Sequence, residues 1–164
     1  MTKDEKWVAE QRQQAVAYLE REAVRHGGVG DWPAFHVSPY IAIWAVQSNV
    51  AAGKIGWWVA TGDCPSDYIS GKGIVNPRVA MDAFSRGWKS MAVYMKKGRN
   101  PPGSRIGTAQ NRKVLGRLLH RRATVLAQWA SDRDVWLGIL DAKDLPNDTS
   151  DRIAHPGRVR RRSR

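Results

Sequence analysis

The stretch PYIAIWAVQSNVAAGKIGWWVATGDCPSDYI, residues 39–69, decides the fold of this chain. Within it, residues 40–47 and 54–61 are short apolar runs rich in Ile, Val and Trp, which is typical of buried strands. The connection between them is short and contains a glycine, which predicts an antiparallel hairpin. A third short strand is expected near Ile69 or over residues 73–75. Because a hairpin alone is marginally stable in water, helices must cover its apolar surface.

Three helices are predicted around this hairpin. Residues 3–26 carry a narrow apolar stripe and end before a pair of glycines. The Asn76-Pro77 pair is a strong helix start, and the helix that follows runs to about Lys97. Residues 109–131 place leucines on one side and cations on the other. The sequence therefore predicts an α+β fold, in which an antiparallel hairpin or a small three-stranded sheet packs against three helices.

Length and charge set the organisation of the chain. Its 164 residues suit a single domain, expected over residues 1–145, followed by a basic, disordered tail over residues 146–164. Residues 135–140 are either a final helical turn or an edge strand. The formal net charge is +12, and half of it comes from the six arginines of residues 152–164. This balance favours an acidic partner, nucleic acid included.

Several features of the sequence predict a cytoplasmic protein. The single cysteine excludes an internal disulfide and favours a reducing compartment. The N-terminus is charged at once, unlike a signal peptide. No apolar run approaches the roughly 20 residues that would span a bilayer, so no membrane partner is expected. The four histidines lack metal-ligand spacing, and we expect neither a metal nor a cofactor.

The loop after the second predicted strand holds the main candidate site. Asp63 and Asp67 lie four residues apart, Pro65 stiffens the loop between them, and Tyr68 adds a hydroxyl group. Such a group can form an acidic recognition edge, or a carboxylate pair for acid/base or metal chemistry. The alternative is turn chemistry, in which the carboxylates accept backbone N–H bonds. No histidine or third acid lies close in sequence, and Cys64 has no framing residues typical of a nucleophile.

A tryptophan pair precedes this loop. Trp57 and Trp58 occupy adjacent strand positions, so their rings are predicted to point to opposite faces of the sheet. One ring should pack on helices, and the other is exposed, covered by the N-terminal helix, or part of a binding surface. Tryptophan is enriched at interaction hot spots. The candidate binding residues are therefore Trp57, Trp58, Asp63, Asp67 and Tyr68.

The last predicted helix offers a second candidate site. Four cations on its polar side could lie along the phosphates of a nucleic acid, with the Arg-rich tail as an additional arm. The alternative is an ordinary solvated helix face. No aromatic residues alternate with these cations, so stacking on bases is not predicted. The four residues are Arg112, Lys113, Arg117 and Arg121.

Residues 56–68 also carry a resemblance, through the pattern GWW-x3-GD-x-P-x-DY. This pattern resembles the hallmark of a family of small bacterial proteins of unknown function. The resemblance covers residues 5–137 and departs from the family pattern at Cys64, where leucine would be expected. It implies a fold neighbourhood and no activity. The other matching features are Pro39 to Trp44, Pro77-Arg78 with Phe84 and Trp88, and Arg122-Ala123 with Trp129.

Three functions follow from these features. The preferred one is a non-enzymatic protein-binding module of the bacterial cytoplasm, of which an immunity-type or adaptor protein is one concrete form. It rests on the small size of the chain, the absence of a complete catalytic constellation and the Trp/Asp/Tyr group at the end of the hairpin. The alternatives are a nucleic-acid binder that uses the 109–131 helix and the tail, and a small enzyme that uses Asp63 and Asp67.

Overall fold

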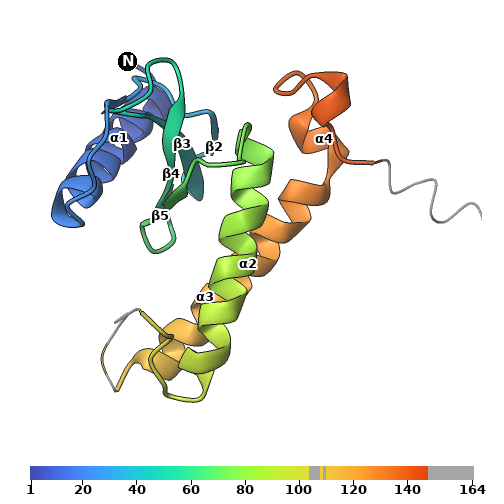
Figure 1. The fold of residues 1–164 in the computed structure, drawn as a ribbon. Helices are drawn as coiled ribbons and strands as arrows, with labels where there is room; N and C mark the ends of the chain where they lie inside the picture. Colours follow the sequence, from blue (N-terminus) through green and yellow to red (C-terminus); the bar gives the residue numbers. More distant parts are fainter. Residues whose placement is uncertain (104–107, 109, 148–164) are drawn as a thin grey trace, which may run out of the picture.

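The computed structural model describes residues 1–103, 108 and 110–147, and it has three layers (Figure 1). Helix α1 (Lys3–Arg21) covers one face of an antiparallel sheet. Helices α2 (Pro77–Lys96) and α3 (Arg112–Ser131) pair with each other on the opposite face. The predicted α+β class and its three main helices are thus confirmed. Most of the predicted tail, residues 148–164, lies outside the described residues.

The sheet has five strands, more than the sequence predicts. The expected hairpin is the β3–β4 pair, and the expected third strand is β5, which pairs with β4. The two additional strands come from residues 27–39, where the sequence predicts no strand, and both pair with β3. The strands are β1 (Gly28–Val29), β2 (Phe35–Val37), β3 (Ile41–Gln47), β4 (Ile55–Gly62) and β5 (Asp67–Ser70), in the order β1-β3-β4-β5 with β2 also on β3.

Strand alternation divides the apolar side chains between two cores. Trp44 on β3 and Val59 on β4 are partners in the ladder and both face α1. Their neighbours along the strands, such as Ile43 and Trp58, face α2 and α3. This is the period-two pattern of a strand that is covered on both faces. The prediction that Trp57 and Trp58 point to opposite faces is confirmed, because Trp57 packs into the α1 core.

Helix α1 ends earlier than predicted. It stops at Arg21 instead of near residue 26, and Ala23 adopts a left-handed conformation with φ of 55°. The Val24 N–H then donates to the Leu19 carbonyl at 2.9 Å, which closes the last turn. This early stop places Glu22 beside the sheet edge instead of inside a longer helix.

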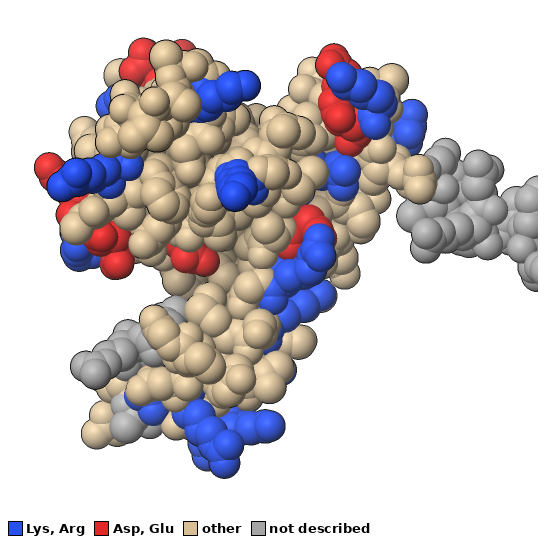
Figure 2. Space-filling view, viewed as in Figure 1, with Lys and Arg blue, Asp and Glu red and all other residues tan. Residues whose placement is uncertain are grey.

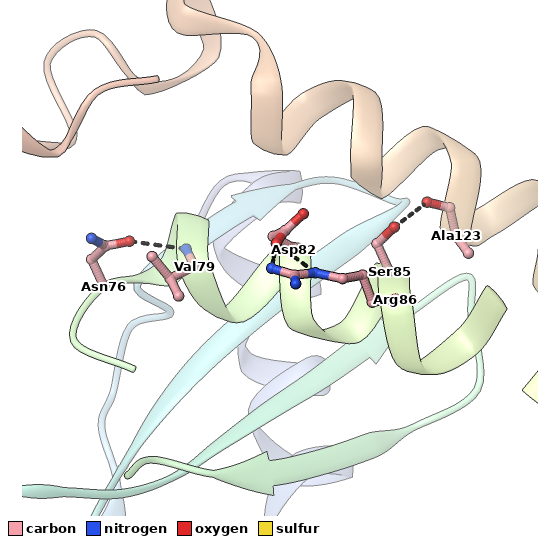
Figure 3. A network of polar contacts seen from close by, with 6 residues as sticks. All are labelled: Asn76, Val79, Asp82, Ser85, Arg86 and Ala123. Atoms are coloured by element: carbon pink, nitrogen blue, oxygen red, sulfur yellow. Dashed lines mark hydrogen bonds and ion pairs between the residues drawn. The ribbon is translucent and has the colours of Figure 1, made fainter. Parts of the chain in front are cut away.

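Helix α2 begins as predicted. The Asn76 side chain accepts a hydrogen bond from the Val79 N–H at 3.0 Å, and Pro77 follows at the first helical position (Figure 3). One buried bond joins α2 to α3, because the Ser85 hydroxyl donates to the Ala123 carbonyl at 2.8 Å (Figure 3). Since both atoms are sequestered from water, this bond fixes the relative positions of the two helices.

The chain after α3 folds back onto the sheet side of the helices. A short helix, α4 (Arg133–Trp136), and a 3-10 turn, η1 (Ala142–Asp144), follow α3. Trp136 is buried and packs on Phe35, with ring centroids 4.6 Å apart. Of the two alternatives for residues 135–140, the helical turn is therefore the one observed, though it begins earlier. Among the described residues, no helix is long and apolar enough to cross a membrane.

Candidate functional site

The predicted site lies where β4 turns into β5. Gly62 ends β4 with φ of 131°, and a Cβ atom there would lie 2.4 Å from the Tyr40 carbonyl oxygen. The Asp63 N–H donates to that same oxygen at 2.9 Å. Only glycine tolerates both the backbone angle and the close approach. The glycine therefore sets the direction in which the loop of residues 63–66 leaves the sheet.

Asp63 binds α3. Its carboxylate accepts a hydrogen bond from Arg122 Nη2 at 2.7 Å, and its carbonyl oxygen accepts from Arg122 Nε at 2.8 Å. The Asp63 side chain is 61 % exposed, so this ion pair contributes about 1 kcal/mol or less. Its main effect is geometric, because it holds the loop against α3.

Asp67 binds α2 instead. Its Oδ2 accepts a hydrogen bond from Trp88 Nε1 at 2.9 Å, and its Oδ1 accepts from the Tyr68 N–H at 2.9 Å. Burial raises the pKa of the Asp67 carboxyl above its usual range, although these two hydrogen bonds act in the opposite direction. In the described part of the chain, no Lys, Arg or His forms an ion pair with Asp67.

Tyr68 lies on the α1 side of the edge strand, within an aromatic cluster. Its ring meets Tyr18 edge-on at 5.9 Å and Trp57 edge-on at 5.6 Å. Burial raises the pKa of the Tyr18 hydroxyl, and the nearby Asp67 and Glu22 carboxylates raise it further. The Trp57 indole donates to a backbone carbonyl, so its polar edge is satisfied.

Trp58 has a different role from the one predicted. It is 1 % exposed and its indole N–H donates to the Ile74 carbonyl at 3.0 Å. A side chain buried to this extent in the α2–α3 core cannot touch a partner directly. Of the other four predicted binding residues, Asp63 lies in the loop, Asp67 and Tyr68 lie on the edge strand β5, and Trp57 lies on β4 against the α1 core.

Two pockets flank the loop. The larger, of about 680 Å³, opens between α1, β5 and α2, and we call it the acidic pocket. The smaller, of about 240 Å³, opens between the loop and α3, and we call it the apolar pocket. Trp88 lines both of them. The acidic pocket is lined chiefly by Tyr18, Glu22, Ser66, Asp67, Tyr68 and Trp88, and the apolar pocket by Tyr40, Cys64, Trp88, Arg122, Val125 and Trp129.

The Cys64 thiol in the apolar pocket is unreactive. Burial, with a contribution from the Asp63 carboxylate, raises the pKa of its thiol to about 12. Because the thiolate is the nucleophile, this cysteine stays protonated and inert near neutral pH. The pocket is therefore a mainly apolar hollow with one guanidinium, from Arg122, at its edge.

The two aspartates are held by different helices. Asp63 is held by α3 and Asp67 by α2, so each carboxylate has its own structural partners. Within residues 1–103, 108 and 110–147, no three His, Cys, Asp or Glu side chains are grouped to hold a metal ion. The arrangement is suited to recognising a group that enters either pocket.

The second predicted site is partly rearranged. Lys113, Arg117 and Arg121 are exposed on α3 as expected. Arg112 is half-buried, and its Nη1 donates to the Gly98 carbonyl at 3.0 Å, so it closes the α2–α3 connection instead of facing a ligand. A hollow of about 260 Å³ is lined by Lys96, Arg117, His120 and Arg121.

Sequence reasoning did not predict the residues that complete the pockets. Tyr18 and Glu22 lie some 45 residues before the loop, and Trp88 lies 21 residues after Asp67. In the sequence, Trp88 and Tyr18 follow the apolar periodicity of their helices, which indicates core positions. Trp88, Arg122 and Trp129 belong to the features that carry the resemblance, but nothing in the sequence indicated that Trp88 contacts Asp67 or that Arg122 contacts Asp63.

Comparison with known proteins gives one match. The family described as a domain of unknown function (DUF4826) matches residues 2–136, from the cap of α1 to the end of α4. The matched range contains the loop, both pockets and the α2–α3 pair. No curated protein and no solved structure matches the chain.

Proposed function

Since this chain belongs to the DUF4826 family, a family of unknown function, we propose a function from its geometry: a non-enzymatic protein-binding module. Its acidic pocket would receive a lysine or arginine side chain of the partner, next to the loop of residues 63–66. An immunity-type or adaptor role in the bacterial cytoplasm is one concrete form of this function.

The observation that carries this proposal is the composition of the acidic pocket. Two carboxylates, from Glu22 and Asp67, share the hollow with the rings of Tyr18, Tyr68 and Trp88. Aromatic rings attract cations through their negatively charged faces, and a carboxylate adds a direct ion pair. A lysine or arginine side chain also places its apolar stem against such rings.

The state of Asp67 supports the same proposal. Its carboxylate is partly desolvated, which disfavours the charged form, and the raised pKa expresses that cost. A cation that entered the pocket would stabilise the charged form and lower this pKa. The hydrogen bond from Trp88 already fixes the carboxylate in place, so little side-chain freedom would be lost on binding.

The apolar pocket supplies a second contact for the same partner. Tyr40, at its mouth, is 54 % exposed, and Trp129 lies half-buried in its wall. A partner segment that crosses the loop would reach both pockets, with a basic side chain in one and an apolar side chain in the other. Aromatic anchors in partly desolvated pockets are typical of interaction hot spots.

The test is a quantitative pull-down from extract of the native host, with the full chain as bait. The variant Glu22→Gln/Asp67→Asn removes both pocket charges. The control Glu10→Gln/Glu20→Gln removes two charges from exposed positions on α1. The wild type and the control should recover the same stoichiometric protein, and the pocket variant should lose it. Replacing lysines and arginines of that protein one by one should identify the side chain that enters the pocket.

Two results would contradict the proposal. The first is that the wild type recovers no protein in stoichiometric amount. The second is that the pocket variant retains the partner as well as the control does, with both variants folded by circular dichroism.

A further inference from the structure

The charges of this chain are strongly segregated. Of its 27 Lys and Arg residues, 11 lie in residues 83–131, whereas none of its 15 Asp and Glu residues does. Outside this segment, basic and acidic residues are nearly balanced. The segment begins inside α2 and ends with α3, so the charge imbalance belongs to one structural unit, the α2–α3 hairpin.

This hairpin extends beyond the sheet. In Figure 1 the C-terminal end of α2 and the N-terminal end of α3 project away from the strands. Figure 2 shows Lys and Arg side chains on this projecting part, and no Asp or Glu on the visible face of that part. A projecting unit of one charge sign is available for contact with a large partner of opposite sign.

Three of the arginines along the hairpin bind partners within the protein. Arg86 pairs with Asp82, Arg122 pairs with Asp63, and Arg112 binds a backbone carbonyl. Four of the other Lys and Arg residues lie together with a histidine, and we call this group the basic ridge: Lys96 on α2 with Lys113, Arg117, His120 and Arg121 on α3.

The ridge has regular geometry. Lys113, Arg117 and Arg121 are spaced at four-residue intervals on α3, which places them about 6 Å apart along the helix axis. All three are exposed, and within the described residues none of them forms an ion pair. Lys96 on α2 and Arg117 and Arg121 on α3 line the 260 Å³ hollow together with His120.

We propose that the basic ridge binds the phosphate backbone of a nucleic-acid duplex, without reading its sequence. A duplex presents about one phosphate for every 1.7 Å of its axis, so the roughly 12 Å from Lys113 to Arg121 faces several phosphates. The ridge lies on two helices that a buried hydrogen bond joins. Its cations are therefore held on a rigid surface, which suits a rigid partner such as a duplex.

A single strand fits the ridge less well than a duplex. Binding of single strands depends on aromatic side chains on which bases stack. Tyr94 is the exposed aromatic of α2, and it lies two positions from Lys96, on the opposite side of the helix. The contacts offered by the ridge are therefore charge contacts.

The test is a binding titration of the full chain with a fluorescently labelled duplex of about 20 base pairs over a series of salt concentrations. The ridge variant Lys113→Gln/Arg117→Gln/Arg121→Gln is compared with the control Lys6→Gln/Lys54→Gln/Lys72→Gln, which loses the same charge from exposed sites elsewhere. The arginines of residues 152–164 are present in every protein, so differences between variants report on the ridge.

We expect the wild type to bind the duplex with an affinity that falls as salt rises. The ridge variant should bind about tenfold more weakly or worse at low salt, with a log–log salt slope smaller by about 2 to 3. The control should keep the wild-type slope. The pocket variant Glu22→Gln/Asp67→Asn should also bind normally, which separates this proposal from the proposed protein-binding function.

Four results would overturn the proposal. They are the absence of duplex binding at low salt, an equal loss in the ridge variant and the control, tighter binding of a single strand than of the duplex, and tighter binding of anionic lipid vesicles than of the duplex. Circular dichroism of each variant shows that a loss of binding is not a loss of fold.

Discussion

At the residue scale, the contact between Trp88 and Asp67 joins the core to the candidate site. The Trp88 side chain is 1 % exposed, and its only polar atom donates to the Asp67 carboxylate at 2.9 Å. An indole N–H that is buried needs an acceptor, and here the acceptor is a partly desolvated carboxylate. The same contact therefore satisfies the core and fixes the orientation of a group that faces the acidic pocket.

This contact gives a pH prediction for the variant Asp67→Asn. Burial raises the pKa of Asp67 in the folded state, so the folded protein binds a proton more tightly there than the unfolded chain does. The contribution of Asp67 to the free energy of unfolding is thus fully present below its ordinary pKa. This contribution is lost as the pH rises through the raised pKa. We expect wild-type stability to fall relative to Asp67→Asn as the pH rises from about 4 through the raised pKa of Asp67.

Urea unfolding of both proteins at several pH values measures this difference. Asparagine has one acceptor oxygen where aspartate has two, so the variant removes the titration and keeps one of the two hydrogen bonds that Trp88 and Tyr68 donate. The loss of the other bond lowers stability by the same amount at every pH. Glu20→Gln, at an exposed position on α1, serves as the control. A stability difference between wild type and Asp67→Asn that is the same at every pH would contradict the prediction.

At the element scale, two helical glycines show how closely α2 and α3 approach. A Cβ atom at Gly116 on α3 would lie 2.7 Å from the Met95 Cβ and 2.8 Å from the Lys96 backbone nitrogen. Around Gly87 on α2 there is open space, with nothing within 4 Å of the corresponding position. The same residue type therefore has a packing role at one site and none at the other.

Replacing each glycine by alanine should have opposite effects on stability. Gly87→Ala should raise the free energy of unfolding by about 0.5–1 kcal/mol, because alanine is the better helix former. Gly116→Ala should lower it by about 1–3 kcal/mol, because the added methyl group pushes α3 away from α2. Denaturant unfolding of the two variants checks this, and equal effects at the two positions would show that the helices are not packed so closely.

Elements with strong local signals were predicted from the sequence. Asn76-Pro77 marked the start of α2, and β3 and β4 followed from their apolar runs. β1 and β2 were missed because strands of two and three residues between glycines and prolines carry no usable periodicity. The end of α1 was misplaced because the left-handed conformation of Ala23 is uncommon for a residue other than glycine.

The candidate site was predicted only in part, for a related reason. The sequence placed Asp63, Asp67 and Tyr68 in one loop, since they are neighbours along the chain. It could not place Tyr18 and Glu22 beside them, because that proximity depends on how α1 lies across the sheet. Neighbours in sequence can be predicted from spacing, whereas neighbours across layers need the packing of the whole molecule.

At the scale of the whole molecule, one sheet serves two apolar cores. Leu19 lies in the α1 core and Phe84 in the α2–α3 core, and each is almost fully buried. The strands β3 and β4 contribute alternate residues to both cores. If these strands unfolded from one core, the apolar side chains of the other core would also become exposed to solvent. This arrangement predicts a single cooperative unfolding transition.

The variants Leu19→Ala and Phe84→Ala test this prediction. Each should destabilise the protein by about 2–5 kcal/mol through lost burial and a residual cavity. Each should also leave one transition, with the same midpoint by tryptophan fluorescence and by far-UV circular dichroism. Two separate transitions in Leu19→Ala would show that the α1 layer unfolds independently of the rest.

The position of Trp88 as a wall of both pockets has a consequence for how ligands would sense each other. Both linings include this one residue, so a shift of its side chain would alter both pockets. The hydrogen bond from the indole nitrogen to Asp67 resists such a shift. Ligands bound in the two pockets would therefore act on the same side chain, and each would affect the binding of the other.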